Sequence, residues 1–128
     1  MSVSNSKNNL IIMPTIFGRF FFKLTDSKNL IGEFSNNFSK RNWTESSDRI
    51  IPNAADGKFD GDYFSTWHEE NGGQHECVLA KLEIKQKPEN IFSLIWWRVN
   101  NGVPETNPFF RGEGILCDGI LIGDYQDC

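Results

Sequence analysis

After the polar residues 1–9, apolar side chains recur at every second position rather than at every third or fourth. The first such run covers residues 19–25, where Phe20, Phe22 and Leu24 alternate with their neighbours. Polar residues 26–29 interrupt it, and a second run follows at 30–35. A period of two is typical of a β-strand with one buried face. Two short runs joined by four polar residues predict a β-hairpin.

The same pattern returns in the second half of the chain. Strands are expected at 58–69, 77–85, 91–99, 109–116 and 120–125, with turn-forming residues at 71–73, 87–90 and 118–119 and a loop at 100–107 between them. The 91–99 run is apolar on both faces, as expected of a strand covered on each side. Seven or eight strands joined by short connections form an antiparallel meander, which must close to bury its inner face. The pattern therefore predicts an all-β fold, an up-and-down β-barrel of about eight strands.

Residues 36–57 are the least regular part of the chain, with Trp43, Ile50 and Ile51 as their large apolar side chains. A long irregular connection in a small domain is usually functional or mobile. We expect this segment to act as a lid over the barrel mouth. A short helix or an edge strand at 46–51 is the alternative.

The length of 128 residues fits one domain. We expect residues 1–14 to be a flexible N-terminal tail and residues 15–128 to form the barrel. The apolar residues 10–13 are interrupted by Pro14 and then Arg19, which disfavours a signal peptide. Three cysteines without a C-x-x-C pair indicate reduced thiols, and hence a cytoplasmic protein.

Charge and motifs exclude several classes of function. Thirteen Lys and Arg against 17 Asp and Glu give a net charge of −4, which disfavours a nucleic-acid partner. No apolar run approaches the roughly 18 residues of a membrane span. The His and Glu residues at 68–76 lack the spacing of a compact metal motif, and a solvated hairpin tip explains them. We therefore expect neither a metal nor a cofactor.

Catalytic signatures are equally weak. Nucleophile, phosphate-loop and Cys/His motifs are missing from the sequence. Four acidic residues could supply an acid–base pair, but acids on strands mostly lie on the solvated outer face. These residues are Asp60, Asp62, Glu113 and Asp124. We assign no catalytic residue and favour a protein that is not an enzyme.

The aromatic content, 11 Phe, 4 Trp and 2 Tyr, indicates what fills the barrel. A barrel of about eight strands has an interior just wide enough for side chains or one small ligand. Trp96 and Trp97 are adjacent, so in a strand they must point to opposite faces. We place Trp97 at the ligand site. The other tryptophan then lies on the outer face, which suggests an oligomer interface.

Residues 61–125 resemble uncharacterised bacterial calycin-like β-barrel domains of the lipocalin and avidin type. The resemblance covers about half of the chain and implies a barrel. It rests on Gly61-Asp62-Tyr63, Leu82-Glu83-Ile84, Leu94-Ile95-Trp96, Phe110-Arg111-Gly112-Glu113-Gly114 and Leu121-Ile122-Gly123-Asp124-Tyr125.

Two stretches are similar to the avidin family in particular. Residues 32–36 are similar to its first strand, and 56–57 followed by 61–65 to its third. The resemblance implies that Asn36, Tyr63 and Ser65 lie where avidins hydrogen-bond the ureido ring of biotin. The later strands lack the tryptophans of an avidin wall, so the ligand itself is not carried over.

Our leading hypothesis is a non-enzymatic barrel that binds a small apolar or aromatic ligand in its mouth. An interaction or oligomerising module with a side-chain-filled barrel is the alternative. An isomerase or cyclase built in the lumen is the third. The predicted ligand-binding residues are Asn36, Trp43, Tyr63, Ser65, Trp67, Trp97 and Phe110.

Overall fold

The computed structural model describes residues 15–39, 41–50, 58–71 and 73–128. These residues form an all-β structure with a single 3-10 turn at Pro88–Asn90. The expected strands of both halves are confirmed, with ends that differ by a few residues. The strands are β1 (Phe17–Leu24), β2 (Leu30–Asn36), β3 (Trp43–Arg49), β4 (Gly61–Asn71), β5 (Gln74–Lys87), β6 (Ile91–Asn100), β7 (Val103–Pro104), β8 (Phe110–Cys117) and β9 (Ile120–Asp127).

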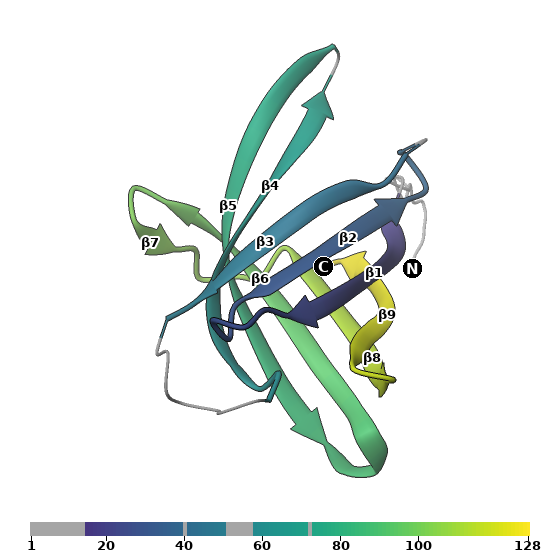
Figure 1. The fold of residues 1–128 in the computed structure, drawn as a ribbon. Helices are drawn as coiled ribbons and strands as arrows, with labels where there is room; N and C mark the ends of the chain where they lie inside the picture. The colour runs from purple at the N-terminus through teal and green to yellow at the C-terminus, as the bar shows by residue number, and fades with distance from the viewer. Residues whose placement is uncertain (1–14, 40, 51–57, 72) are drawn as a thin grey trace, which may run out of the picture.

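Eight of these strands close into an antiparallel barrel (Figure 1). Consecutive strands pair along the chain, and the β5–β6 pairing joins the two ends of the sheet order β5-β4-β3-β2-β1-β9-β8-β6. The short β7 pairs only with the end of β6. The predicted up-and-down barrel of about eight strands is confirmed. The predicted tail, residues 1–14, lies outside the described residues.

Glycines allow neighbouring strands to coil tightly where the barrel closes. A side chain at Gly123 in β9 would collide with the carbonyl oxygen of Glu113 in β8. A side chain at Gly32 in β2 would meet the carbonyl oxygen of Phe21 in β1. Glycine is tolerated within a strand where another backbone approaches this closely. These residues are therefore required by barrel geometry.

Side chains fill one half of the barrel, toward the β1–β2 turn. Alternate positions of the strands point inward, as the period of two requires. The largest fully buried apolar side chains are Phe22, Leu30, Tyr63, Leu82, Ile84, Leu94 and Leu121. This half of the barrel is therefore a packed core of apolar side chains.

Arg49 closes the packed end of the barrel. Its side chain is buried, and its guanidinium donates hydrogen bonds to the carbonyl oxygens of Lys28, Lys58 and Asp60 at 2.9, 2.7 and 2.8 Å. The same guanidinium lies over the Tyr63 ring, 4.7 Å from its centroid. Three oriented carbonyl dipoles and an aromatic face replace the water that a buried cation loses.

The lid predicted for 36–57 is wrong over residues 43–49. These residues form β3, which pairs with β2 on one edge and with β4 on the other. The inward positions of β3 are polar, Glu45, Ser47 and Arg49, so no apolar alternation marks the strand. The alternative of a strand here is confirmed, although it is a wall strand and not an edge. Residues 51–57 lie outside the described residues.

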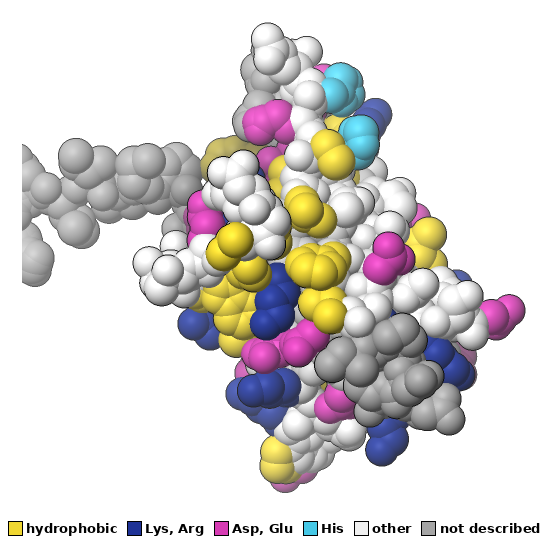
Figure 2. Space-filling model, turned by 90° about the vertical axis from the view of Figure 1, so that its left-hand side faces the viewer, with side chains coloured by type: hydrophobic (Ala, Val, Ile, Leu, Met, Phe, Trp, Pro, Cys, Tyr) yellow, Lys and Arg dark blue, Asp and Glu magenta, His cyan; other side chains and the backbone are white. Residues whose placement is uncertain are grey.

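The β4–β5 hairpin projects beyond the barrel (Figure 1). The pairing of β4 with β3 ends at Trp67, and that of β5 with β6 begins at Ala80. Beyond these points the two strands pair only with each other. Figure 2 shows both histidines gathered on this projection, with acidic and basic side chains scattered over the face below. No described helix is long and apolar enough to cross a membrane.

Gly123→Ala should lower the free energy of unfolding by about 2 kcal/mol, because the new methyl group must displace a neighbouring backbone. Gln126→Ala, at an exposed position of the same strand, is the control and should change it by less than about 0.5 kcal/mol. Urea unfolding measures both. Equal effects of the two substitutions would contradict the close approach of β8 and β9.

Candidate ligand-binding pocket

A cavity of about 550 Å³ opens at the end of the barrel opposite Arg49. Seven barrel strands and the β2–β3 connection contribute to its wall. The lining residues are Ile16, Phe20, Phe34, Asn36, Phe38, Ser39, Arg41, Trp43, Glu45, Trp67, Glu69, Glu70, Trp96, Phe110 and Tyr125. The volume lies within the range of about 300–1,000 Å³ that is usual for small-molecule sites.

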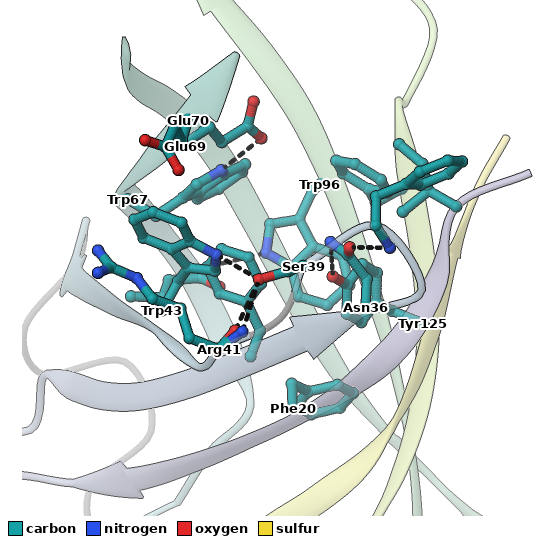
Figure 3. Close-up of a pocket in the computed structure, with 15 residues that line it drawn as sticks. Phe20, Asn36, Ser39, Arg41, Trp43, Trp67, Glu69, Glu70, Trp96 and Tyr125 are labelled. Carbon is teal, nitrogen blue, oxygen red and sulfur yellow. Dashed lines mark hydrogen bonds between the residues drawn. The ribbon is translucent and has the colours of Figure 1, made fainter. Parts of the chain in front are cut away.

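Aromatic side chains make up most of the wall (Figure 3). Neighbouring rings meet edge to face: Phe34 lies 6.0 Å from Trp67 and 6.3 Å from Tyr125, measured between centroids. Phe110 approaches Tyr125 in the same way at 5.5 Å. Contacts of this kind hold each ring in place and leave the wall preformed.

Glu45 is the buried polar residue of the cavity wall, with a side chain only 4% exposed. Its Oε2 accepts hydrogen bonds from Trp96 Nε1 at 2.9 Å and from the Ser65 hydroxyl at 2.5 Å. Ser65 uses its proton on Glu45, so the Ser47 hydroxyl, 2.8 Å away, is the donor to Ser65. Within the described part of the chain, Oε1 of Glu45 makes no hydrogen bond.

Burial controls the protonation of this carboxyl. Desolvation raises the pKa of Glu45 from 4.5 to about 7, and the hydrogen bonds from Ser65 and Trp96 oppose that rise. The group therefore gains and loses a proton near neutral pH. Burial also raises the pKa of Tyr125 to about 12, and its hydroxyl accepts a hydrogen bond from Asn36 Nδ2 at 3.1 Å. Tyr125 thus remains protonated.

The rim of the cavity is held by local contacts of the β2–β3 connection. Trp43 Nε1 donates to the Ser39 hydroxyl at 2.6 Å, and that hydroxyl donates to the Arg41 carbonyl oxygen at 2.6 Å. The Arg41 guanidinium lies over the Trp43 ring, 4.1 Å from its centroid. On the neighbouring strand β4, Trp67 Nε1 donates to Glu69 Oε1 at 2.9 Å. Figure 3 shows both of these hydrogen-bonded groups.

Four of the predicted ligand-binding residues line this cavity: Asn36, Trp43, Trp67 and Phe110. Ser65 lies behind the wall, where it orients Glu45. Whether these residues contact a ligand stays a prediction.

The structure places two predicted site residues elsewhere. Tyr63 is fully buried in the packed half and donates to the Phe59 carbonyl oxygen at 2.6 Å. Trp97 faces outward beneath the Lys81 ammonium, 5.3 Å from its ring centroid. The assignment of Trp97 to the pocket is wrong. Phe92, Leu94 and Trp96 occupy alternate, buried positions of β6, so the side chain of the next residue, Trp97, points to the outer face. Trp96 occupies the place that we gave to Trp97.

Glu45 was missed by the sequence reasoning, although a signal was present. That signal is a position: in residues 43–49, Glu45, Ser47 and Arg49 occupy every second place, and so they share one face of a strand. The register from β2 places that face inside the barrel, because Gly32, which is buried, pairs with Glu45. Only the pairing of the strand reveals the direction in which these polar groups point.

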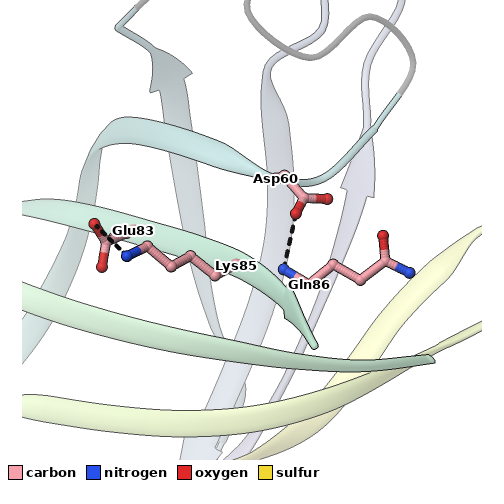
Figure 4. A network of polar contacts seen from close by, with 4 residues as sticks. All are labelled: Asp60, Glu83, Lys85 and Gln86. Carbon is pink, nitrogen blue, oxygen red and sulfur yellow. Dashed lines mark hydrogen bonds and ion pairs between the residues drawn. The ribbon is translucent and has the colours of Figure 1, made fainter. Parts of the chain in front are cut away.

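The carboxylates considered for acid–base chemistry lie away from the cavity. Glu113 pairs with Asp124 across β8 and β9, and both are exposed. Asp60 Oδ2 accepts a hydrogen bond from the backbone N–H of Gln86 at 2.8 Å, next to the Lys85–Glu83 ion pair of β5 (Figure 4). Among the described residues, no three His, Cys, Asp or Glu side chains are grouped to hold a metal ion.

Comparison with known proteins adds no family to this description. No protein-family model, no curated protein and no solved structure gives a significant match to the chain.

The raised pKa of Glu45 makes stability depend on pH. Between its ordinary value of 4.5 and about 7, the folded chain holds a proton that the unfolded chain has released. Stability should therefore fall as pH rises through this window, by roughly 3 kcal/mol in total. Glu45→Gln keeps an acceptor for Ser65 and Trp96 but has no proton to lose. In urea unfolding at pH 5 and pH 8, the variant should lose most of this difference.

An equal pH dependence in Glu45→Gln and in the wild type would assign the effect to other groups. Glu113→Gln, on the exposed outer wall, is the matched control and should leave the pH dependence unchanged.

Proposed function

We propose that the chain is a calycin-like, non-enzymatic binding protein whose barrel mouth holds one small ligand with an aromatic or apolar body. The observation that carries this proposal is Oε1 of Glu45, which lies in the wall of an aromatic cavity and makes no hydrogen bond to any of the described residues. Buried polar atoms are almost always hydrogen-bonded, and leaving one unpaired is costly. A ligand that donates a hydrogen bond to this oxygen would remove that cost.

The composition of the wall supports a ligand with a rigid apolar body. Small-molecule sites are mostly apolar and carry a few convergent polar groups. Here, rings from seven strands surround the space, and the Glu45 carboxyl is held in place by Ser65 and Trp96. A flat ligand would stack between preformed rings, while its polar end is oriented by Glu45.

The serine hydroxyls next to Glu45 favour binding over nucleophilic catalysis. Ser65 donates to Glu45, as an activated nucleophile would. Its side chain is fully buried behind the cavity wall, however, and it is not among the lining residues. The hydrogen bond therefore orients the carboxyl and presents no nucleophile to a ligand.

Trp43→Ala should weaken binding of N-phenyl-1-naphthylamine, a neutral apolar fluorophore, about tenfold. Removing one aromatic contact costs on the order of 1.4 kcal/mol, which corresponds to a factor of ten. Trp97→Ala is the matched control, since this half-buried tryptophan lies on the outer wall. Its affinity should stay within twofold of the wild type, as measured by fluorescence titration with one site per chain.

Two results would contradict this function. One is a wild-type protein without saturable binding of the fluorophore. The other is an equal loss of affinity in Trp43→Ala and Trp97→Ala. Both variants should keep the wild-type far-ultraviolet circular dichroism, because neither tryptophan is part of the buried core.

We propose self-association as a second candidate function, because an apolar stripe crosses the outer wall. The stripe consists of one residue from each of four neighbouring strands, β1, β9, β8 and β6. In that order, and paired each with the next, they are Phe21, Ile122, Ile115 and Ile91. Ile115 and Ile122 are 51% and 48% exposed. The occupant that we propose is a second copy, whose own stripe matches it in length and chemistry through a two-fold contact.

Light scattering after size-exclusion chromatography tests the stripe. The wild type should show twice the chain mass of 14.7 kDa, and Ile122→Glu should show that mass once. Leu79→Glu, at an exposed apolar position on β5, is the control and should remain dimeric. A monomeric wild type, or a control that dissociates as well, would overturn this candidate.

A further inference from the structure

We propose that the ligand of this cavity is a cation, namely a protonated amine on a flat or apolar body, with its N–H directed at Oε1 of Glu45. The inference rests on the proposed function and names the ligand class for the same site. Three independent features of the lining lead to it: its charge, its rings and the state of its buried carboxyl.

The charge of the lining is acidic. Its described residues include three carboxyl side chains, Glu45, Glu69 and Glu70, against the single guanidinium of Arg41. Arg41 lies over the Trp43 ring at the rim. Glu69 uses one oxygen to accept from Trp67. A concave site lined by one sign of charge concentrates ligands of the opposite sign.

The rings strengthen the same preference. Aromatic faces carry a partial negative charge and attract ammonium groups within about 6 Å of their centroids. Trp96 donates its Nε1–H to Oε2 of Glu45 at 2.9 Å, so the carboxyl lies at the edge of this indole, and the ring faces open to an ammonium are those of the other aromatic residues of the lining. Phe20 and Tyr125 pack on the Trp96 ring at 5.9 and 6.1 Å between centroids. The carboxyl and the rings together resemble the aromatic cages that recognise amines.

The buried carboxyl of Glu45 favours cationic ligands over neutral and anionic ones. An anionic ligand would place two negative groups in a site with little water, and a neutral ligand would leave the ionised carboxylate without a counter-ion. A protonated amine supplies both the missing hydrogen bond and the missing charge. An ion pair of this kind gains from the low local dielectric, provided that its hydrogen bonds are made.

Binding of an amine should be linked to the release of a proton. Burial raises the pKa of Glu45 to about 7, and the cation selects the ionised carboxylate. The charged or titratable groups that face Glu45 are Glu69 and Glu70 from β4, Arg41 from the β2–β3 connection and Tyr125 from β9. The lining residues from β1, β2, β6 and β8 are not ionisable. Below pH 7, affinity should fall about tenfold per pH unit.

Three indoles of similar shape test the inference: tryptamine, tryptophol and indole-3-propionate. They carry an ammonium, a hydroxyl and a carboxylate on the same ring system. Isothermal titration calorimetry at pH 8 should show tryptamine binding at least tenfold more tightly than tryptophol, and indole-3-propionate binding most weakly. At pH 5.5 the affinity for tryptamine should be about 30-fold lower, and that for tryptophol nearly unchanged.

Glu45→Gln and Glu113→Gln remove the same charge from inside and outside the barrel. Glu45→Gln should abolish the preference for tryptamine over tryptophol and the pH dependence of tryptamine binding. Glu113→Gln should behave as the wild type. If Glu45→Gln fails to fold, the affinities of the wild type for the three indoles still show whether the site prefers a cation.

The outcomes separate this inference from the proposed function. Equal affinities for tryptamine and tryptophol, or a preference that survives in Glu45→Gln, would overturn the cation assignment and leave the binding barrel standing. If none of the indoles and no neutral fluorophore binds, the proposed function fails together with the inference.

Discussion

The polar inner face of β3 is the constraint on which the rest of the structure depends. This strand directs Glu45, Ser47 and Arg49 into a barrel in which Ser65 is the only other buried polar side chain among the described residues. Each of these groups must replace its lost water with hydrogen bonds. Arg49 does so at one end, with backbone carbonyl oxygens of the chain segments around it. Glu45 does so near the other end, with only one of its two oxygens.

The two ends of the barrel therefore differ both in the charge that is buried there and in how densely the side chains are packed. Around Arg49, the interior of the described barrel is occupied by carbonyl groups and the Tyr63 ring, which contact the guanidinium. Around Glu45, the aromatic rings stand apart and enclose a cavity of about 550 Å³. Ser47 lies between the two charged residues on this face, and its hydroxyl supports the Ser65–Glu45 hydrogen bond. One strand thus determines which end is closed and which end is open.

The sequence was informative wherever strands follow the ordinary division into apolar interior and polar surface. The β1–β2 hairpin, the last five long strands and the meander connections could be predicted, because Phe20, Phe22 and Leu121 mark an inner face by their spacing. β3 could not be predicted in this way, because its inner face is polar. The hydrogen-bonding partner that makes a buried Glu45 tolerable, Ser65, lies 20 residues further along the chain, so the local sequence does not reveal it. Trp96 and Trp97 could not be assigned either. Their side chains are identical, and only the pairing of β6 distinguishes them.

The projecting part of the β4–β5 hairpin has a consequence for how the pocket can adapt. Glu69 and Glu70 stand on a two-stranded ribbon beyond the last pairing of β4 with β3, whereas Glu45 stands in a strand paired on both edges. A ribbon with one neighbour opens at a lower free energy than a closed barrel wall. The acidic rim can therefore bend and fray while the floor keeps its geometry. The part of the wall that carries Glu69 and Glu70 is thus held by fewer strand pairings than the part that carries Glu45.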